Sequence, residues 1–192
     1  MDTEWLTEDE QASWLRLIAV VELLPAVLDS QLRADSGLTH FEYFVLAMLS
    51  EAPERTLRMT SLAQRTNATL SRLSHVVNRL ERRGLVKRFP CPEDGRATNA
   101  RLTPAGWDAV AAAAPGHVET VRRSVVDALT PTQLKQLRSI GDALLTRLDP
   151  DRRLTGLYDP VGEPPVIATH ISSTQRSANP SSMRPRRTSS PR

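Results

Sequence analysis

The feature that most constrains the fold is the repeated pairing of helix-start signals with apolar residues at helical spacing. Thr7 with Glu10, and Thr39 with Glu42, have the spacing of a capping box, in which two side chains satisfy free amides at the start of a helix. Apolar residues then recur every three or four positions, as on the buried face of a helix. Aromatic residues make up only 4% of the chain, so Leu, Val and Ala must fill its core. The sequence predicts a mainly α-helical fold.

Two further helices are predicted after these, separated by a tight turn. We expect Thr60 to cap a short helix, residues 66–68 to form the turn, and Thr69 to cap a longer helix that stops at Gly84. The buried face of the longer helix is predicted to carry Leu70, Leu73, Val76, Val77 and Leu80.

A hairpin is predicted directly after the longer helix. Residues 85–89 and 99–103 mix apolar and polar side chains with a strand-like period, and the stretch 90–97 between them is rich in turn formers. The order helix, turn, helix, hairpin predicts a winged helix-turn-helix, the wing being the small β-hairpin.

Charge is concentrated in this part of the chain. Residues 58–101 contain ten Lys and Arg but only three acidic residues, whereas the net charge of the whole chain is +3. A basic segment inside an otherwise acidic scaffold is typical of a nucleic-acid-binding face. The alternative is an ordinary solvated charged surface.

The exposed face of the longer helix carries hydrogen-bonding and cationic groups. Arg72 has the donor geometry to bind a guanine edge, Asn78 could contact an adenine edge or a phosphate, and Arg79 is better placed for phosphates. The residues predicted to contact DNA on this helix are Thr69, Ser71, Arg72, Ser74, His75, Asn78 and Arg79.

At the predicted hairpin tip, Arg96 follows Gly95. A narrow minor groove favours an inserted arginine because its negative potential is enhanced, so we add Arg96 to the predicted DNA contacts. Asp94 is expected to orient that arginine by pairing with it. Asp94-Gly95 alone would indicate only an ordinary turn, but its position after the longer helix favours a wing.

The rest of the chain is predicted to be helical up to a polar tail. Thr103-Pro104 and Thr130-Pro131 start two helices. We expect Pro25 to kink the first helix and Pro115-Gly116 to bend or break a later one. The predicted division is a dimerisation helix (1–38), a winged lobe (39–103), further dimerisation helices (104–149) and a disordered basic tail (150–192).

Several classes of protein do not fit the sequence. We find no run of 18 apolar residues and no basic signal at the N-terminus, so no membrane partner is predicted and we expect a cytoplasmic protein. The scattered histidines lack zinc-ligand spacing, and no catalytic motif or cofactor site is visible. The single cysteine, Cys91, lies between two prolines, a poor setting for a reactive thiolate.

The sequence resembles the MarR family of winged-helix regulators over about residues 5–149. The matching blocks are Ser61-Leu62-Ala63, Leu73 to Val77, Arg79 to Arg88, Pro92 to Ala97 and Arg101 to Gly106. At Thr66-Asn67 the family more often has an apolar residue followed by glycine. Asn tolerates the left-handed conformation, so we expect the turn to be kept.

The resemblance implies a homodimeric transcription factor, most often a repressor, that binds double-stranded DNA at a pseudo-palindromic operator. It also implies a small-molecule effector bound between the dimerisation helices and the lobe. Trp14, His40, Phe41, Phe44 and Trp107 are candidates for that pocket, and ordinary core or surface positions are the alternative for at least half of them. The competing functional hypothesis is a helical interaction module whose basic face binds an acidic protein or another polyanion.

Overall fold

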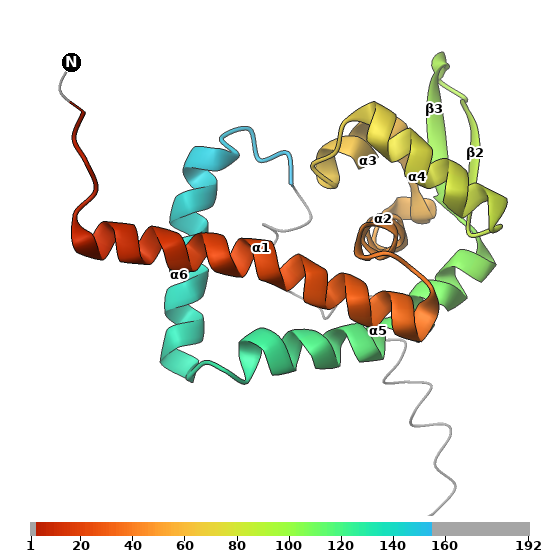
Figure 1. Cartoon of the computed structure of the whole chain (residues 1–192). Helices are drawn as coiled ribbons and strands as arrows, with labels where there is room; N and C mark the ends of the chain where they lie inside the picture. The colour runs from red at the N-terminus through yellow and green to blue at the C-terminus, as the bar shows by residue number, and fades with distance from the viewer. Residues whose placement is uncertain (1–2, 155–192) are drawn as a thin grey trace, which may run out of the picture.

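The computed structural model describes residues 3–154, which form a helical protein with one small sheet (Figure 1). The long helix α1 (Glu8–Ser36) packs along α5 (Pro104–Val121), and α6 (Pro131–Leu148) follows at the opposite end of the molecule from the sheet. Most of the predicted tail, residues 155–192, lies outside the described residues.

A compact lobe contains the other helices and the sheet. Its helices are α2 (His40–Ser50), α3 (Met59–Arg65) and α4 (Leu70–Arg82), and its strands are β1 (Thr56–Arg58), β2 (Val86–Cys91) and β3 (Asp94–Leu102). A short 3-10 turn, Pro53–Arg55, precedes β1. The sheet is antiparallel in the order β1-β3-β2. The predicted fold class, mainly α with a small β-wing, is confirmed.

Helix α1 begins at the predicted capping box. The Thr7 hydroxyl accepts from the Glu10 amide at 3.3 Å, and the Glu10 carboxylate accepts from the Thr7 amide at 2.8 Å. The helix continues through Pro25 and ends where Gly37 adopts the left-handed conformation, with φ 64°. Because its only buried residues are Leu28 and Leu32, most of α1 lacks a partner surface within the described chain.

Length and composition give α1 a second property. Among residues 3–154, α1 is the one helix long and apolar enough to cross a membrane, with an 18-residue window of mean hydropathy 1.5. The sequence analysis did not predict this. A helix that packs against a second protein chain can have the same composition, so the property alone does not assign a membrane role.

The wing is longer than predicted. Strand β2 extends to Cys91 and β3 begins at Asp94, so only Pro92 and Glu93 remain between the strands. Proline in this stretch indicated a loop, but β2 is an edge strand, where Pro90 is tolerated, and the pairing register shifts there.

At the start of the lobe one prediction was wrong and one strand was not predicted. Thr60 does not cap α3: the N-cap is Arg58, which makes no side-chain cap hydrogen bond. Residues 56–58 form β1, which pairs with β3 and adds a third strand. A run of three residues is too short for its periodicity to be recognised in the sequence.

A close backbone contact fixes the first turn of α5 on the lobe. A Cβ atom added at Gly106 would lie only 2.1 Å from the carbonyl oxygen of Leu85, so no larger residue fits without a shift. The Thr103 hydroxyl also donates to the carbonyl of Gly84 at 2.7 Å. Any movement of α5 is therefore transmitted to the region where α4 meets β2.

The later helices differ from prediction in one respect. Helix α5 passes through Pro115 without a break, and the departure from α geometry comes later, as a π-helical turn at Arg122–Val126. Helix α6 begins with a capping box of Thr130 and Gln133 and contains no buried residue.

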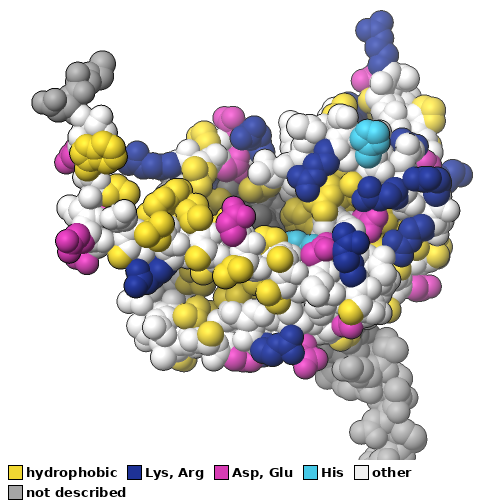
Figure 2. All heavy atoms as spheres, in the orientation of Figure 1, with side chains coloured by type: hydrophobic (Ala, Val, Ile, Leu, Met, Phe, Trp, Pro, Cys, Tyr) yellow, Lys and Arg dark blue, Asp and Glu magenta, His cyan; other side chains and the backbone are white. Residues whose placement is uncertain are grey.

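Apolar side chains are exposed over α1 and the C-terminal helices. Figure 2 shows them gathered away from the lobe, on the side where α1 begins. Each of the following is at least 40% exposed: Trp14, Leu15, Leu17, Val20, Val21, Leu23 and Val27 of α1, Val118 of α5, and Leu137, Ile140, Leu144 and Leu148 of α6. Apolar surface of this extent marks an interaction site.

Two histidines lie where α2 meets α5. The His40 and His117 rings stack with centroids 6.1 Å apart, and the Tyr43 ring is 4.5 Å from that of His117. Burial lowers the pKa of both histidines below their ordinary 6.5. The nearby Asp29 partly opposes this shift at His40, whereas the proximity of His40 adds to it at His117. His117 Nδ1 is buried without a hydrogen-bond partner among the described residues. The packing of α5 on α2 therefore favours the neutral rings.

The histidine pair predicts a pH dependence of stability. As the pH falls through 6.5, the unfolded chain binds protons that the folded chain resists, so the free energy of unfolding decreases. We expect the urea midpoint of the full chain to be lower at pH 6 than at pH 7.5. The decrease should be smaller in His117→Gln, and an equal decrease in that variant would assign the pH effect to other groups.

Candidate nucleic-acid interface

The turn between α3 and α4 forms although Thr66-Asn67 replaces the expected apolar residue and glycine. Asn67 adopts the left-handed conformation, with φ 47°. Thr66 is buried, and its hydroxyl donates to the carbonyl of Leu62 at 2.7 Å, so its polar group is satisfied inside the lobe. The Ala68 amide then bonds to the carbonyl of Ala63 at 2.9 Å and closes the turn.

Helix α4 presents a polar face to solvent. Thr69 caps it, accepting from the Arg72 amide at 3.2 Å, while Leu73, Val76, Val77 and Leu80 are buried as predicted. Ser71, Arg72, His75, Asn78 and Arg79 are exposed and Ser74 is half-buried. The prediction for Leu70 was wrong: it is 49% exposed, because it lies at the edge of the apolar face in the first turn.

One flank of α4 rests on the start of α2. The Arg72 guanidinium lies 4.4 Å from the centre of the Phe41 ring. Two turns further along the helix, Arg79 Nε donates to Glu42 Oε1 at 3.1 Å, and Arg83 Nη1 lies 3.8 Å from Glu42 Oε2. Residues of α2 therefore position these arginines: Arg72 rests on an aromatic ring, whereas Arg79 and Arg83 interact with a carboxylate.

The Glu42 carboxylate accepts hydrogen bonds from two different elements. Its Oε2 accepts from the Thr39 amide at 2.9 Å, completing the predicted capping box of α2, while its Oε1 receives Arg79. Burial by itself would raise the pKa of Glu42, but the Thr39 amide and the Arg79 side chain favour the carboxylate and bring its pKa below the ordinary 4.5. The sequence analysis recognised only the cap.

The other flank of α4 is tied to β2. Arg88 donates from Nη2 to Glu81 Oε2 at 2.7 Å and from its backbone amide to Glu81 Oε1 at 2.9 Å. The same guanidinium donates to Asn78 Oδ1, so the amide oxygen of Asn78 faces β2. The bonds that Arg88 donates to Glu81, first from its backbone amide and then from its side chain, lower the pKa of the Glu81 carboxyl. Arg88 was part of the basic segment in the sequence, but nothing there indicated that it positions Asn78.

The wing carries an exposed arginine beyond its turn. Asp94 Oδ1 accepts the backbone amide of Arg96 at 3.1 Å, and the Arg96 side chain is exposed. The expected pairing of Asp94 with the Arg96 side chain is not found: the carboxylates of Asp94 and Glu93 lie 4.0 and 3.6 Å from Arg58 of β1. Arg58 therefore stabilises the wing, and the Arg96 side chain is left exposed on the wing. Cys91, by contrast, is buried.

A hollow of about 230 Å³ lies between α4 and the wing. It brings together two predicted DNA contacts, Ser74 and Arg96, which are distant in sequence. Its full lining is Met59, Thr60, Leu70, Ser74, Arg88, Arg96, Ala97 and Thr98. Figure 2 shows Lys and Arg side chains grouped over α4 and the wing, so the polar face, the hollow and the wing form one cationic surface.

The five candidate effector residues do not line a common cavity in the described chain. Phe41 packs under Arg72, Trp107 lies 3.9 Å from the Arg55 guanidinium, and His40 stacks with His117. Phe44 packs partly buried against the lobe core, and Trp14 is 51% exposed on α1. The structure thus places each of the five in different surroundings.

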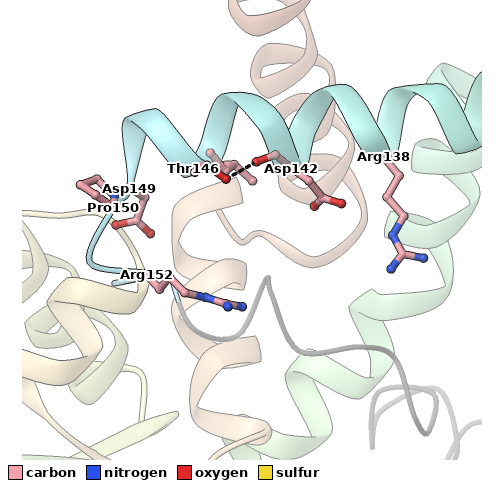
Figure 3. Close-up of a pocket in the computed structure, with 7 residues that line it drawn as sticks. Arg138, Asp142, Thr146, Asp149, Pro150 and Arg152 are labelled. Atoms are coloured by element: carbon pink, nitrogen blue, oxygen red, sulfur yellow. Dashed lines mark hydrogen bonds between the residues drawn. The ribbon is translucent and has the colours of Figure 1, made fainter.

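A second hollow, of about 470 Å³, lies along α6 and the turn after it (Figure 3). The Thr146 hydroxyl donates to the Asp142 carbonyl at 2.9 Å, and the buried Asp149 accepts the amides of Arg153 and Leu154 at 3.0 Å. The lining is Arg138, Asp142, Leu145, Thr146, Asp149, Pro150 and Arg152. It contains none of the predicted site residues, so we do not include it in the interface.

The same arrangement occurs in known proteins. The sequence profile of the MarR family matches residues 38–98, from the start of α2 into the wing. Over 77% of its length the chain is 44% identical to Sco3205, a MarR family transcriptional regulator from Streptomyces coelicolor crystallised in complex with DNA, and it covers 92% of that protein with a TM-score of 0.74. The chain belongs to the MarR family.

Two further relatives are transcription factors as well. AbsC, a transcriptional regulator from Streptomyces coelicolor, is 38% identical, with coverage of 76% of this chain and 98% of that one and a TM-score of 0.72. The HTH-type transcriptional repressor YetL of Bacillus subtilis is 31% identical over 88 residues. That alignment spans 46% of this chain and about half of YetL, 53%.

The contacts of Glu42 predict that it stabilises the MarR lobe. In Glu42→Gln the amide oxygen can still accept from Thr39, but the charge that attracts Arg79 and Arg83 is lost. We expect the free energy of unfolding to fall by about 1–3 kcal/mol, as for hydrogen bonds to charged groups, measured by urea denaturation. The same change at the exposed Glu119 is the control, with an expected effect below about 0.5 kcal/mol.

The pKa of Glu42 adds a second readout. Since its pKa is lowered by folding, its stabilisation is present above pH 4.5 and is lost as the pH falls through the folded-state value. Glu42→Gln should lack this part of the acid destabilisation. An unchanged stability and acid profile would show that Arg79 gains nothing from Glu42.

Proposed function

We propose that this MarR family chain is a sequence-specific DNA-binding transcriptional regulator, which acts as a homodimer on a pseudo-palindromic operator. The observation that carries the proposal is the grouping of Lys and Arg side chains over α4 and the wing, on a fold shared with a 44% identical regulator crystallised with DNA. The major groove admits one helix, and a two-fold dimer matches half-sites about 10 base pairs apart.

The contacts we propose follow from how α4 is held. Ser71, His75 and Asn78 lie along the middle of its exposed face and would meet base edges. Ser74 and the cap residue Thr69, on the same helix, would also contact the DNA. Arg72 and Arg79, steadied by α2, would bind a guanine edge and a phosphate respectively. Arg96 would enter the neighbouring minor groove.

The homodimer proposal is supported by the exposed apolar faces of α1, α5 and α6. Covering them with a second copy removes the apolar surface from water, whereas the lobe already has its own core. We further propose that the protein acts in the cytoplasm, as a repressor. Support for repression is the name of YetL, a repressor, and an effector is supported only by the family resemblance.

A gel shift with the DNA upstream of the chain's own gene tests the proposal. A shift that survives excess non-specific duplex supports sequence-specific binding. A shift that is competed equally by any duplex, by heparin or by an acidic protein would instead support the alternative, an interaction module for polyanions.

The position of Arg96 predicts a loss of affinity without a loss of fold. We expect Arg96→Ala to weaken operator binding by about 1–3 kcal/mol and to reduce the salt dependence by about one phosphate equivalent. Arg147→Ala, an equal charge change on exposed α6, is the control. Fluorescence anisotropy at several salt concentrations, with circular dichroism of each variant, measures both effects. Operator binding that is as tight as in the wild type would remove Arg96 from the interface.

The exposed apolar helices predict that a charge there breaks the dimer. In Leu144→Glu the carboxylate would be buried against the second copy, so sedimentation should show a monomer and operator affinity should fall at least tenfold, in line with the penalty for an unpaired buried charge. Arg138→Glu, on the same helix, tests whether added charge alone is responsible. A wild-type chain that sediments as a monomer, or separates with the membrane fraction, would contradict the dimer.

A further inference from the structure

One apolar side chain of the lobe has no place in its core. Within residues 39–103, all of which the structure describes, Leu70 is the one large apolar residue in the exposed class, at 49%. The next apolar residues of α4, Leu73 and Val77, are buried. Leu70 therefore contributes less to the core of the lobe than these residues do, and its exposed half is free to contact a partner.

Leu70 lies where a DNA-reading helix meets its target. It is the first residue of α4, directly after the cap Thr69. Side chains on a helix point back toward its N-terminus, so Leu70 extends over the end of α4 that enters a groove. It lines the hollow between α4 and the wing together with Ser74, one turn further on, and Arg96.

The surroundings of Leu70 favour one kind of partner. Besides Leu70, α4 and the wing contribute Ser74, Arg88, Arg96, Ala97 and Thr98 to the lining of this hollow. The Lys and Arg side chains grouped over α4 and the wing around it favour a polyanion as the partner. On the base edges of the major groove, the C5-methyl group of thymine is the apolar group available to such a side chain.

This inference rests on the proposed DNA binding. We infer that Leu70 contacts the thymine C5-methyl group at one position of each half-site, so that an apolar contact beside the hydrogen-bonding residues of α4 selects thymine. Leu70 was assigned to the buried face from its spacing, and nothing else in the sequence separated it from Leu73. Burial of one methyl group corresponds to a change in affinity of about fourfold.

Replacing thymine with deoxyuridine tests the contact, because uracil keeps the hydrogen-bonding edge and lacks only the methyl group. Full-length protein first selects its binding sequence from a pool of random duplexes. Each thymine of the selected duplex is then replaced singly by deoxyuridine, and the dissociation constants are compared by fluorescence anisotropy at fixed salt. We expect one thymine in each half-site at which the replacement weakens binding about fourfold.

Three variants assign that effect to Leu70. Leu70→Ser should bind the thymine and uracil duplexes equally, whereas Leu70→Met, which remains apolar, should keep a preference for thymine. Ser74→Ala removes a hydroxyl from the same hollow, so it should leave the thymine-to-uracil ratio unchanged even where it alters affinity. Melting curves check that all three variants fold, and the deoxyuridine series on the wild-type protein keeps the inference testable if Leu70→Ser does not fold.

The outcomes separate this inference from the proposed function. Specific binding with no loss at any uracil would overturn the methyl contact and leave DNA recognition intact. A thymine preference that persists in Leu70→Ser would assign the contact to another residue and also overturn the inference. If random selection yields no preferred duplex, the proposed function fails first.

Discussion

The buried carboxylate of Glu42 is the interaction on which the geometry of the lobe depends. It closes the first turn of α2 and at the same time receives two arginines from α4, so one residue fixes the angle between the two helices. Such a carboxylate is costly to bury without partners, but here both oxygens have donors, and its pKa is lowered in spite of burial. The exposed face of α4, which we propose contacts DNA, is thus positioned by α2.

The two parts of the molecule differ in how they are stabilised. The lobe buries its own core and stabilises the wing with ion pairs from Arg58 and from Arg88 to Glu81, whereas in the described part of the chain α6 has no fully buried residue. The contact of Gly106 with Leu85 joins them closely. In the proposed dimer, a change in how the long helices associate would therefore act on the spacing of the two lobes through this contact rather than through a flexible linker.

Local signals in the sequence predicted most of the helices, because a cap and its first turn are contiguous in the chain. The capping boxes at Thr7 and Thr39, the cap at Thr69 and the stop at Gly84 all depend on residues within four positions of one another. Contacts between segments that lie far apart in the sequence could not be predicted from such local signals. Strand β1 exists only because β3 offers it partners, and Leu70 has the spacing of a core residue but lies beyond the edge of the core.

The bond from Arg88 to Asn78 limits what that amide can recognise. A guanidinium carries only donors, so the oxygen of Asn78 must face it and the NH2 group is turned outward. Two-point recognition of adenine uses the oxygen and the nitrogen of an asparagine together. With its oxygen engaged, the Asn78 side chain has only N–H donors left, so in the proposed complex with DNA its counterpart would be an acceptor: a phosphate oxygen, the N7 of a purine, the O6 of guanine or the O4 of thymine.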